Sequence, residues 1–169
     1  MYGRPTWMLR IGLLLMFVIA VGAALSSLAT QRWNGQSLLI HEYVQALDRV
    51  EIAVLQMETG QRGYLITGET PYLAPYEAGR RTITAALDAF TAFDPVAIGL
   101  SAAKPPISGL VADKMDELDR TVALRRDFGA AAARQVMDTD AGRKLMTALR
   151  SELEGLRQQA NSLTKRRQD

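Results

Sequence analysis

Residues 57–76 read METGQRGYLITGETPYLAPY, and this stretch decides the fold because it closes one long helix and opens the next. Upstream, apolar residues recur every three or four positions over residues 36–67, which is the periodicity of one helix face. Gly68 is suited to a left-handed C-terminal cap. Thr70 followed by Pro71 is typical of an N-cap and a first helical position. A turn this short forces the two helices to run antiparallel.

The same periodicity continues beyond this hairpin. It predicts three further helices over residues 71–93, 107–137 and 141–166. The apolar stripe of the third helix includes Leu118, Val122 and Phe128. No segment alternates with a period of two for long enough to form a strand. The sequence therefore predicts an all-α protein with an antiparallel four-helix bundle over residues 36–167.

A separate feature is the run of residues 11–29, which holds 19 positions without a charged residue. As a helix this run is roughly 28 Å long, close to the ~30 Å hydrocarbon core of a bilayer. We therefore expect an N-terminal single transmembrane helix over residues 11–33, preceded by a cytoplasmic stub over residues 1–10. The residues expected at the membrane interfaces are Trp7, Arg10 and Trp33 beside this helix, and Lys165, Arg166 and Arg167 at the end of the fourth helix.

The basic residues before the apolar run set its expected orientation. Arg4 and Arg10 favour a cytoplasmic N-terminus, which places the bundle on the other side of the membrane. A cleaved signal peptide is the alternative, because residues 27–29 form a small-x-small tripeptide. The run is longer than the roughly 7–15 residues of a signal-peptide core, so we favour a retained anchor. Both alternatives export the bundle.

Composition excludes several kinds of site. The 169 residues include one histidine and no cysteine. Disulfides, zinc–thiolate sites, cysteine nucleophiles and two-histidine metal sites are therefore excluded. A formal charge of +2 is too small for a dedicated nucleic-acid binder. The sequence has no nucleophile–base set and no phosphate loop, so we expect no catalysis, no cofactor and no bound metal.

The stretch that closes the first helix also carries the candidate functional residues. Glycines inside a helix cost about 1 kcal/mol each relative to alanine, so we expect Gly60 and Gly63 to admit a neighbouring backbone or ring. Glu58 and Arg62 are four positions apart and are expected to pair, with nearby tyrosine hydroxyls satisfying them. We interpret the pair as a structural clamp, with ligand binding as the alternative. The predicted structural or interaction motif comprises Glu58, Thr59, Gly60, Arg62, Gly63, Tyr64, Gly68, Tyr72, Pro75 and Tyr76.

The pattern METGQRGYL-x-TG-E-x-x-YL-x-PY resembles the signature of the CHASE domain of the third type, an extracytoplasmic sensory module of bacterial histidine kinases and cyclases. A weaker echo lies in the fourth helix, from Gly142 to Arg150. The resemblance covers roughly residues 41–163. It implies a periplasmic helical bundle at the bacterial inner membrane whose role is signal input. It implies no ligand residues, because the ligands of this family are mostly unassigned.

Two functions follow as hypotheses. Sensors of this type carry a second membrane helix and an output domain after the bundle, and neither follows residue 166 here. This departure favours an accessory or scaffolding subunit of a larger membrane complex. The alternative is an extracytoplasmic sensor, either stand-alone or a fragment of a longer receptor. The expected partners are membrane lipid and other membrane-protein subunits or a second copy of the chain, with no small-molecule ligand specified.

Overall fold

The structure is a computed structural model that describes residues 6–100, 107–137 and 139–168, without the side chains of 6–9, 25, 27–37, 136 and 167–168. The chain divides into two compact units, Met1–Leu39 and Ile40–Asp169, which are treated separately below. Over the described residues every regular element is a helix. The all-α class predicted from the sequence is therefore confirmed.

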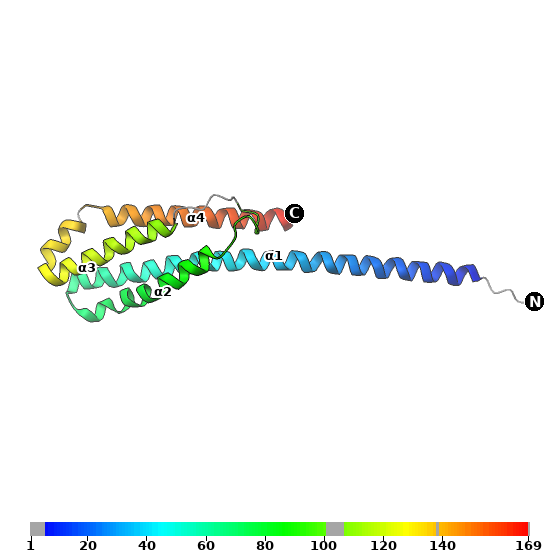
Figure 1. Cartoon of the computed structure of the whole chain (residues 1–169), viewed down its shortest axis with the longest axis horizontal. Helices are drawn as coiled ribbons and strands as arrows, with labels where there is room; N and C mark the ends of the chain where they lie inside the picture. The colour runs from blue at the N-terminus through cyan, green and yellow to red at the C-terminus, as the bar shows by residue number, and fades with distance from the viewer. Residues whose placement is uncertain (1–5, 101–106, 138, 169) are drawn as a thin grey trace, which may run out of the picture. The chain divides into compact units, whose positions relative to one another are not determined.

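Helices of the second unit form the bundle. The elements are α1 (Thr6–Thr67), the short 3-10 helix η1 (Thr70–Leu73), α2 (Ala74–Thr91), α3 (Ile107–Met137) and α4 (Ala141–Gln168). Figure 1 shows α2, α3, α4 and the part of α1 from residue 40 onward side by side, with the chain direction alternating from one helix to the next.

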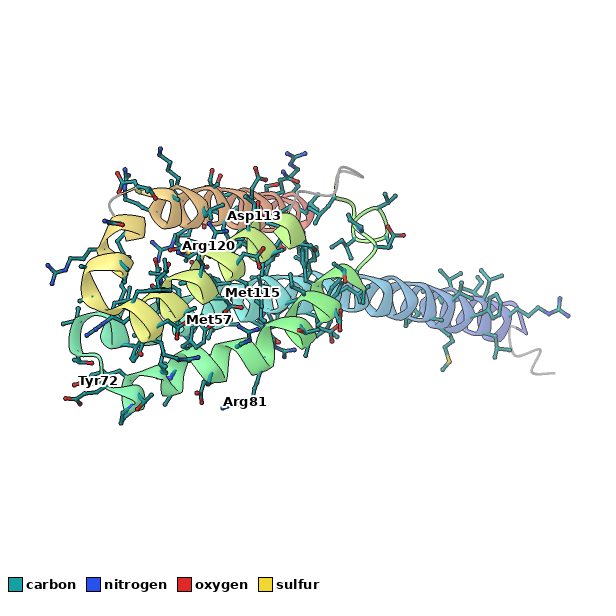
Figure 2. The ribbon with its side chains drawn as sticks, turned by 60° about the vertical axis from the view of Figure 1, so that its left-hand side comes forward. Met57, Tyr72, Arg81, Asp113, Met115 and Arg120 are labelled. Carbon is teal, nitrogen blue, oxygen red and sulfur yellow. The ribbon has the colours of Figure 1, made fainter. Side chains whose placement is uncertain are left out.

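Two apolar clusters form the core of the bundle. The larger takes buried side chains from all four helices and from the loop after α2, where Ile98 and Leu100 turn inward. The smaller lies among the end of α1, η1, α2 and α3, and comprises Met57, Tyr64, Leu73, Tyr76, Leu118 and Val122. Figure 2 shows Met57 and Met115 between the helices, and Met115 is partly buried against both clusters. Burying each large apolar side chain contributes about 1.5–3 kcal/mol, which is what holds the helices together.

The turn between α1 and α2 differs in detail from the prediction. Thr70 is the first residue of η1 rather than an N-cap, and the extended residue before it is Glu69, whose side chain makes no capping hydrogen bond. The α-helix starts at Ala74 rather than at Pro71. The reason is Pro75, which has no N–H to donate to the carbonyl four residues earlier, so a 3-10 turn takes the place of a first α-helical turn.

Helix α3 is broken near its end. Gly129 has a φ of 82° and a ψ of −174°, which lie outside the helical region and divide α3 into two helical segments. The break turns the preceding residue away from the core, and Phe128 is 73% exposed. The prediction that Phe128 belongs to the apolar stripe of α3 is therefore wrong.

The first unit is the N-terminal part of α1. Its side chains over residues 10–24 are exposed, and most of them are large and apolar. No helix in the described part of the chain is long and apolar enough to cross a membrane. The transmembrane helix over residues 11–33 stays a prediction. Of the predicted interface residues, Arg10, Lys165 and Arg166 are exposed, and the side chains of Trp7, Trp33 and Arg167 lie outside the described residues.

Candidate functional site: a buried polar layer in the bundle

The glycines of the hairpin are sites of close helix contact, as the sequence predicts. A Cβ atom on Gly60 would overlap the backbone nitrogen of Tyr76. A Cβ atom on Gly63 would lie 2.9 Å from Cδ1 of the Tyr72 ring. Gly79 of α2 completes this contact from the other side, because its Cβ would lie 2.7 Å from Cγ of Met57. The three glycines therefore set how closely α1 approaches η1 and α2.

The end of α1 is capped from α3. Gly68 takes the left-handed conformation with a φ of 77°, and its N–H donates to the carbonyl of Tyr64 over 2.8 Å, so the predicted cap is confirmed. Nε of Arg125 donates to the carbonyl of Leu65 over 3.1 Å. A Cβ on Gly68 would lie 2.5 Å from the Arg125 guanidinium. The cation thus rests on the negative end of the α1 dipole, where it is favoured.

The hydroxyl of Tyr76 is hydrogen-bonded to a charge pair other than the predicted Glu58–Arg62 pair. Its hydroxyl donates a short hydrogen bond to Asp119 of α3, and Nη1 of Arg80 donates to the same hydroxyl over 3.1 Å. Arg80 and Asp119 also form an ion pair. Burial, followed by the hydrogen bond to Asp119, raises the pKa of Tyr76. The expectation that tyrosine hydroxyls satisfy Glu58 and Arg62 is therefore wrong for Tyr76, which links α2 to α3.

A layer of buried polar residues crosses the bundle between α1, α3 and α4. It contains Glu58, Gln61, Lys114 and Thr121, together with the nearly buried carboxylate of Glu117. Lys114 is its centre and is only 2% exposed. We call this set of five residues the polar layer. A charge this deeply buried is stable only when it is paired and hydrogen-bonded.

Within the described residues, the Lys114 ammonium makes two hydrogen bonds and one further ion pair. Nζ donates to Oε2 of Glu117 over 2.8 Å and to the carbonyl of Gly142 over 3.2 Å, and it lies 3.5 Å from Oε1 of Glu58. Glu58 also accepts from Nη2 of Arg62 over 3.1 Å, so the predicted pair exists. Two carboxylates thus face two cations, and the layer ties α1 to α3 and α4.

The polar layer opens onto two adjoining cavities. The first, which we call the polar cavity, has a volume of about 210 Å³. It is lined by Glu58, Gln61, Arg62, Lys114, Glu117, Met137, Asp140, Gly142 and Arg143. The second, which we call the arginine cavity, has a volume of about 110 Å³ and is lined by Glu58, Arg62, Arg143, Met146, Thr147 and Arg150.

Only part of the predicted motif reaches these cavities. Glu58 and Arg62 line both of them. Gly60, Gly63 and Gly68 act in packing and capping, as described above. The Thr59 hydroxyl donates to the carbonyl of Leu55 over 2.8 Å on the exposed side of α1, and Tyr72 is about half exposed at the hairpin (Figure 2). A binding or interaction role for the motif as a whole stays a prediction.

The residues that sequence reasoning missed come from α3 and α4. Lys114 and Glu117 are three positions apart, a spacing that surface helices show equally often, so nothing local marks them as buried. In the sequence, Gly142 is marked only by its place in the weaker echo of the family pattern. The structure shows why a glycine occupies this position. Its carbonyl accepts from Lys114, and a Cβ there would lie 2.8 Å from the Glu117 carboxylate.

Comparison with known proteins bears on this bundle. The family model described as the CHASE3 domain matches residues 35–169. Neither the comparison with curated proteins nor the comparison with solved structures gives a match for the chain. Among the described residues, no group of three or more histidine, aspartate or glutamate side chains is arranged to hold a metal ion.

Proposed function

Because the chain belongs to the CHASE3 domain family, whose members are extracytoplasmic sensory modules, we propose that its bundle is the signal-input domain of a bacterial receptor. Family membership supports this alternative better than the accessory-subunit function that the sequence favours. The observation that carries the proposal is the polar layer, because a bundle needed only as a spacer has no use for a lysine that is 2% exposed. Buried ion pairs are weak contributors to stability compared with apolar packing, and their best-attested use is to specify register or a switch.

We propose that the polar layer switches between two arrangements of its charges, of which the structure holds one. In the present one, Lys114 holds Glu117 and Glu58 together, and Arg62 shares Glu58. A ligand that competes for Arg62 weakens its bond to Glu58 and leaves Glu58 to Lys114. Such an exchange favours a different register of α1 against α3 and α4. Helix shifts of about 1–2 Å are an established way for a small change at a site to reach a distant output.

The proposal includes a membrane anchor over residues 11–33. The uncharged run of residues 11–29 supports it, and so do the exposed large apolar side chains within residues 11–21, which water disfavours. With Arg10 on the cytoplasmic side, the bundle lies in the periplasm at the inner membrane. Membrane lipid is then one partner, and the receptor's other segments or a second copy of the chain are the others. The proposed role requires no catalytic group.

A receptor chimera tests this function. Residues 1–169 are joined upstream of the second membrane helix and kinase of a well-characterised bacterial receptor, and a transcriptional reporter is read in media of different solute composition. We expect an output that changes with the medium and is lost when residues 40–169 are deleted. The accessory-subunit function is supported instead if the output is constant and the chain, purified from its native membranes, is part of a stable large complex.

A further inference from the structure

The two cavities adjoin each other, and together they are called the groove below. They share Glu58, Arg62 and Arg143, so the polar cavity and the arginine cavity lie against each other along α1 and α4. The buried Lys114 lines the polar cavity, and the exposed Arg150 lines the arginine cavity. One small molecule can therefore contact buried and exposed groups together.

The buried end of the groove carries no surplus charge. Lys114 donates hydrogen bonds to Glu117 and to the carbonyl of Gly142, and it forms an ion pair with Glu58. A further cation would have to displace Lys114, and a further anion would meet the carboxylates of Glu58 and Glu117. The charge that selects a ligand must come from the other end.

The arginine cavity has more cations than anions. Arg62, Arg143 and Arg150 face a single carboxylate, that of Glu58. Arg143 is bound through two hydrogen bonds by Asp140, at 3.0 and 2.8 Å, which also raises its pKa. The other two guanidinium groups, those of Arg62 and Arg150, line the arginine cavity and are less engaged, since Arg62 makes one hydrogen bond with the residues that the structure describes, to Glu58.

Arg150 is the less committed of the two. It forms an ion pair with Glu51, in which Nε of Arg150 lies 3.8 Å from Oε1 of Glu51, longer than a hydrogen bond. Glu51 is bound more closely by Arg157, whose Nη2 lies 2.5 Å away. Arg150 is therefore available to a ligand at little cost to the bundle, and a guanidinium is suited to bind a carboxylate through two parallel hydrogen bonds.

The buried side chain of Gln61 indicates a ligand independently of the arginine residues. Its side chain lines the polar cavity and is only 4% exposed, yet its amide has no hydrogen-bond partner within the described part of the chain. Buried amides are normally paired. A neutral amide offers both a donor and an acceptor, so it suits a hydroxyl or a carbonyl on the ligand.

From these observations we infer that the groove binds a short-chain hydroxy- or keto-carboxylate, with the carboxylate at Arg62 and Arg150 and the hydroxyl or carbonyl at Gln61. The cavities, about 210 and 110 Å³, are smaller than the roughly 300–1,000 Å³ of sites for drug-sized ligands, which limits the ligand to a few carbons. The inference rests on the proposed function, since it names the signal of the same site.

Calorimetric titration of the full chain in mild detergent tests the inference. The probes are lactate and pyruvate, with propionate as the analogue lacking the polar group and sulfate as a tetrahedral anion, all at matched ionic strength. We expect saturable one-site binding of lactate or pyruvate, propionate about tenfold weaker, and no saturable binding of sulfate.

Two variants locate the site. Gln61→Met keeps the side-chain volume and removes the side-chain amide. We expect its unfolding temperature to be no lower than that of the original chain. We also expect it to bind lactate and propionate with equal affinity, because the group that distinguishes them is gone. Arg150→Gln is expected to weaken the binding of every carboxylate probe at least tenfold. Arg81→Gln is the matched control, because Arg81 projects from α2 away from the bundle (Figure 2) and lines neither cavity.

Each remaining outcome overturns the inference. Absence of saturable lactate and pyruvate binding rejects the ligand class, and so does sulfate binding of equal strength. Lactate binding that neither variant in the groove changes places the ligand elsewhere. The receptor chimera separates this failure from that of the proposed function. A chimera that still responds to the medium keeps the sensor role with another ligand, whereas carboxylate binding with a constant chimera output keeps the site and rejects the role.

Discussion

Replacing Lys114 with methionine removes the central cation of the polar layer while keeping a side chain of similar length. The substitution leaves Glu117 without its cation, and the carbonyl of Gly142 loses the hydrogen bond from Nζ. Glu58 keeps its bond from Arg62 at 3.1 Å. Removing one partner of a buried ion pair costs about 3–5 kcal/mol, because the remaining charge stays buried and unpaired.

The lower end of this range applies here. Glu58 is still paired with Arg62, and the side chain of Glu117 is 12% exposed, so water reaches its carboxylate in part. We therefore expect Lys114→Met to lose about 3 kcal/mol of unfolding free energy. For a chain of this length that loss lowers the unfolding temperature by about 6–12 °C.

Circular dichroism during thermal unfolding of the full chain in mild detergent measures the change. The matched control is Lys144→Met, because Lys144 is exposed on α4 and is expected to change stability by no more than about 0.5 kcal/mol. The double variant Lys114→Met with Glu117→Gln removes the stranded charge as well. We expect it to recover part of the loss, with a coupling of about 0.5–3 kcal/mol.

The reasoning is refuted if Lys114→Met unfolds at the same temperature as the control. It is refuted also if the double variant loses as much stability as the two single variants lose in total, because additive losses mean that the two groups do not interact.

The remaining predictions concern packing, pH and topology. Gly60→Ala is expected to lose about 1–3 kcal/mol in chemical denaturation, since its Cβ would overlap Tyr76, whereas Gly155→Ala meets no atom within 4 Å and is expected to gain up to about 1 kcal/mol. Burial raises the pKa of Tyr43 to about 12, so the stability it contributes is complete below pH ~10 and is lost as the pH rises through about 12. Denaturation midpoints measured across that range check this, and Tyr43→Phe should reduce the dependence, leaving the part that comes from Tyr76, whose pKa is also raised. If the bundle lies in the periplasm, alkaline phosphatase fused after the last residue is expected to be active, and a fluorescent protein fused at the same place is expected not to fluoresce. The opposite result would place the bundle in the cytoplasm.

Local features of the sequence were sufficient for the helices and for the hairpin. Gly68 takes the left-handed cap that its position predicts, and the contacts at Gly60 and Gly63 are the close approaches expected of glycines inside a helix. These features depend on residues near one another in the chain, and their energies follow from backbone geometry. The break at Gly129 escaped prediction because one glycine among alanines is compatible with a continuous helix.

The polar layer was decided only by the tertiary structure. Glu58 and Arg62 were found as a pair because they are one helical turn apart, but their neighbour Lys114 lies on another helix. Gln61 and Arg150 line the groove from α1 and α4 and carry no local sign of it. Periodicity identifies which face of a helix is buried. It does not show which residues of the four helices lie at the same height in the bundle, because that depends on the register in which the helices pack.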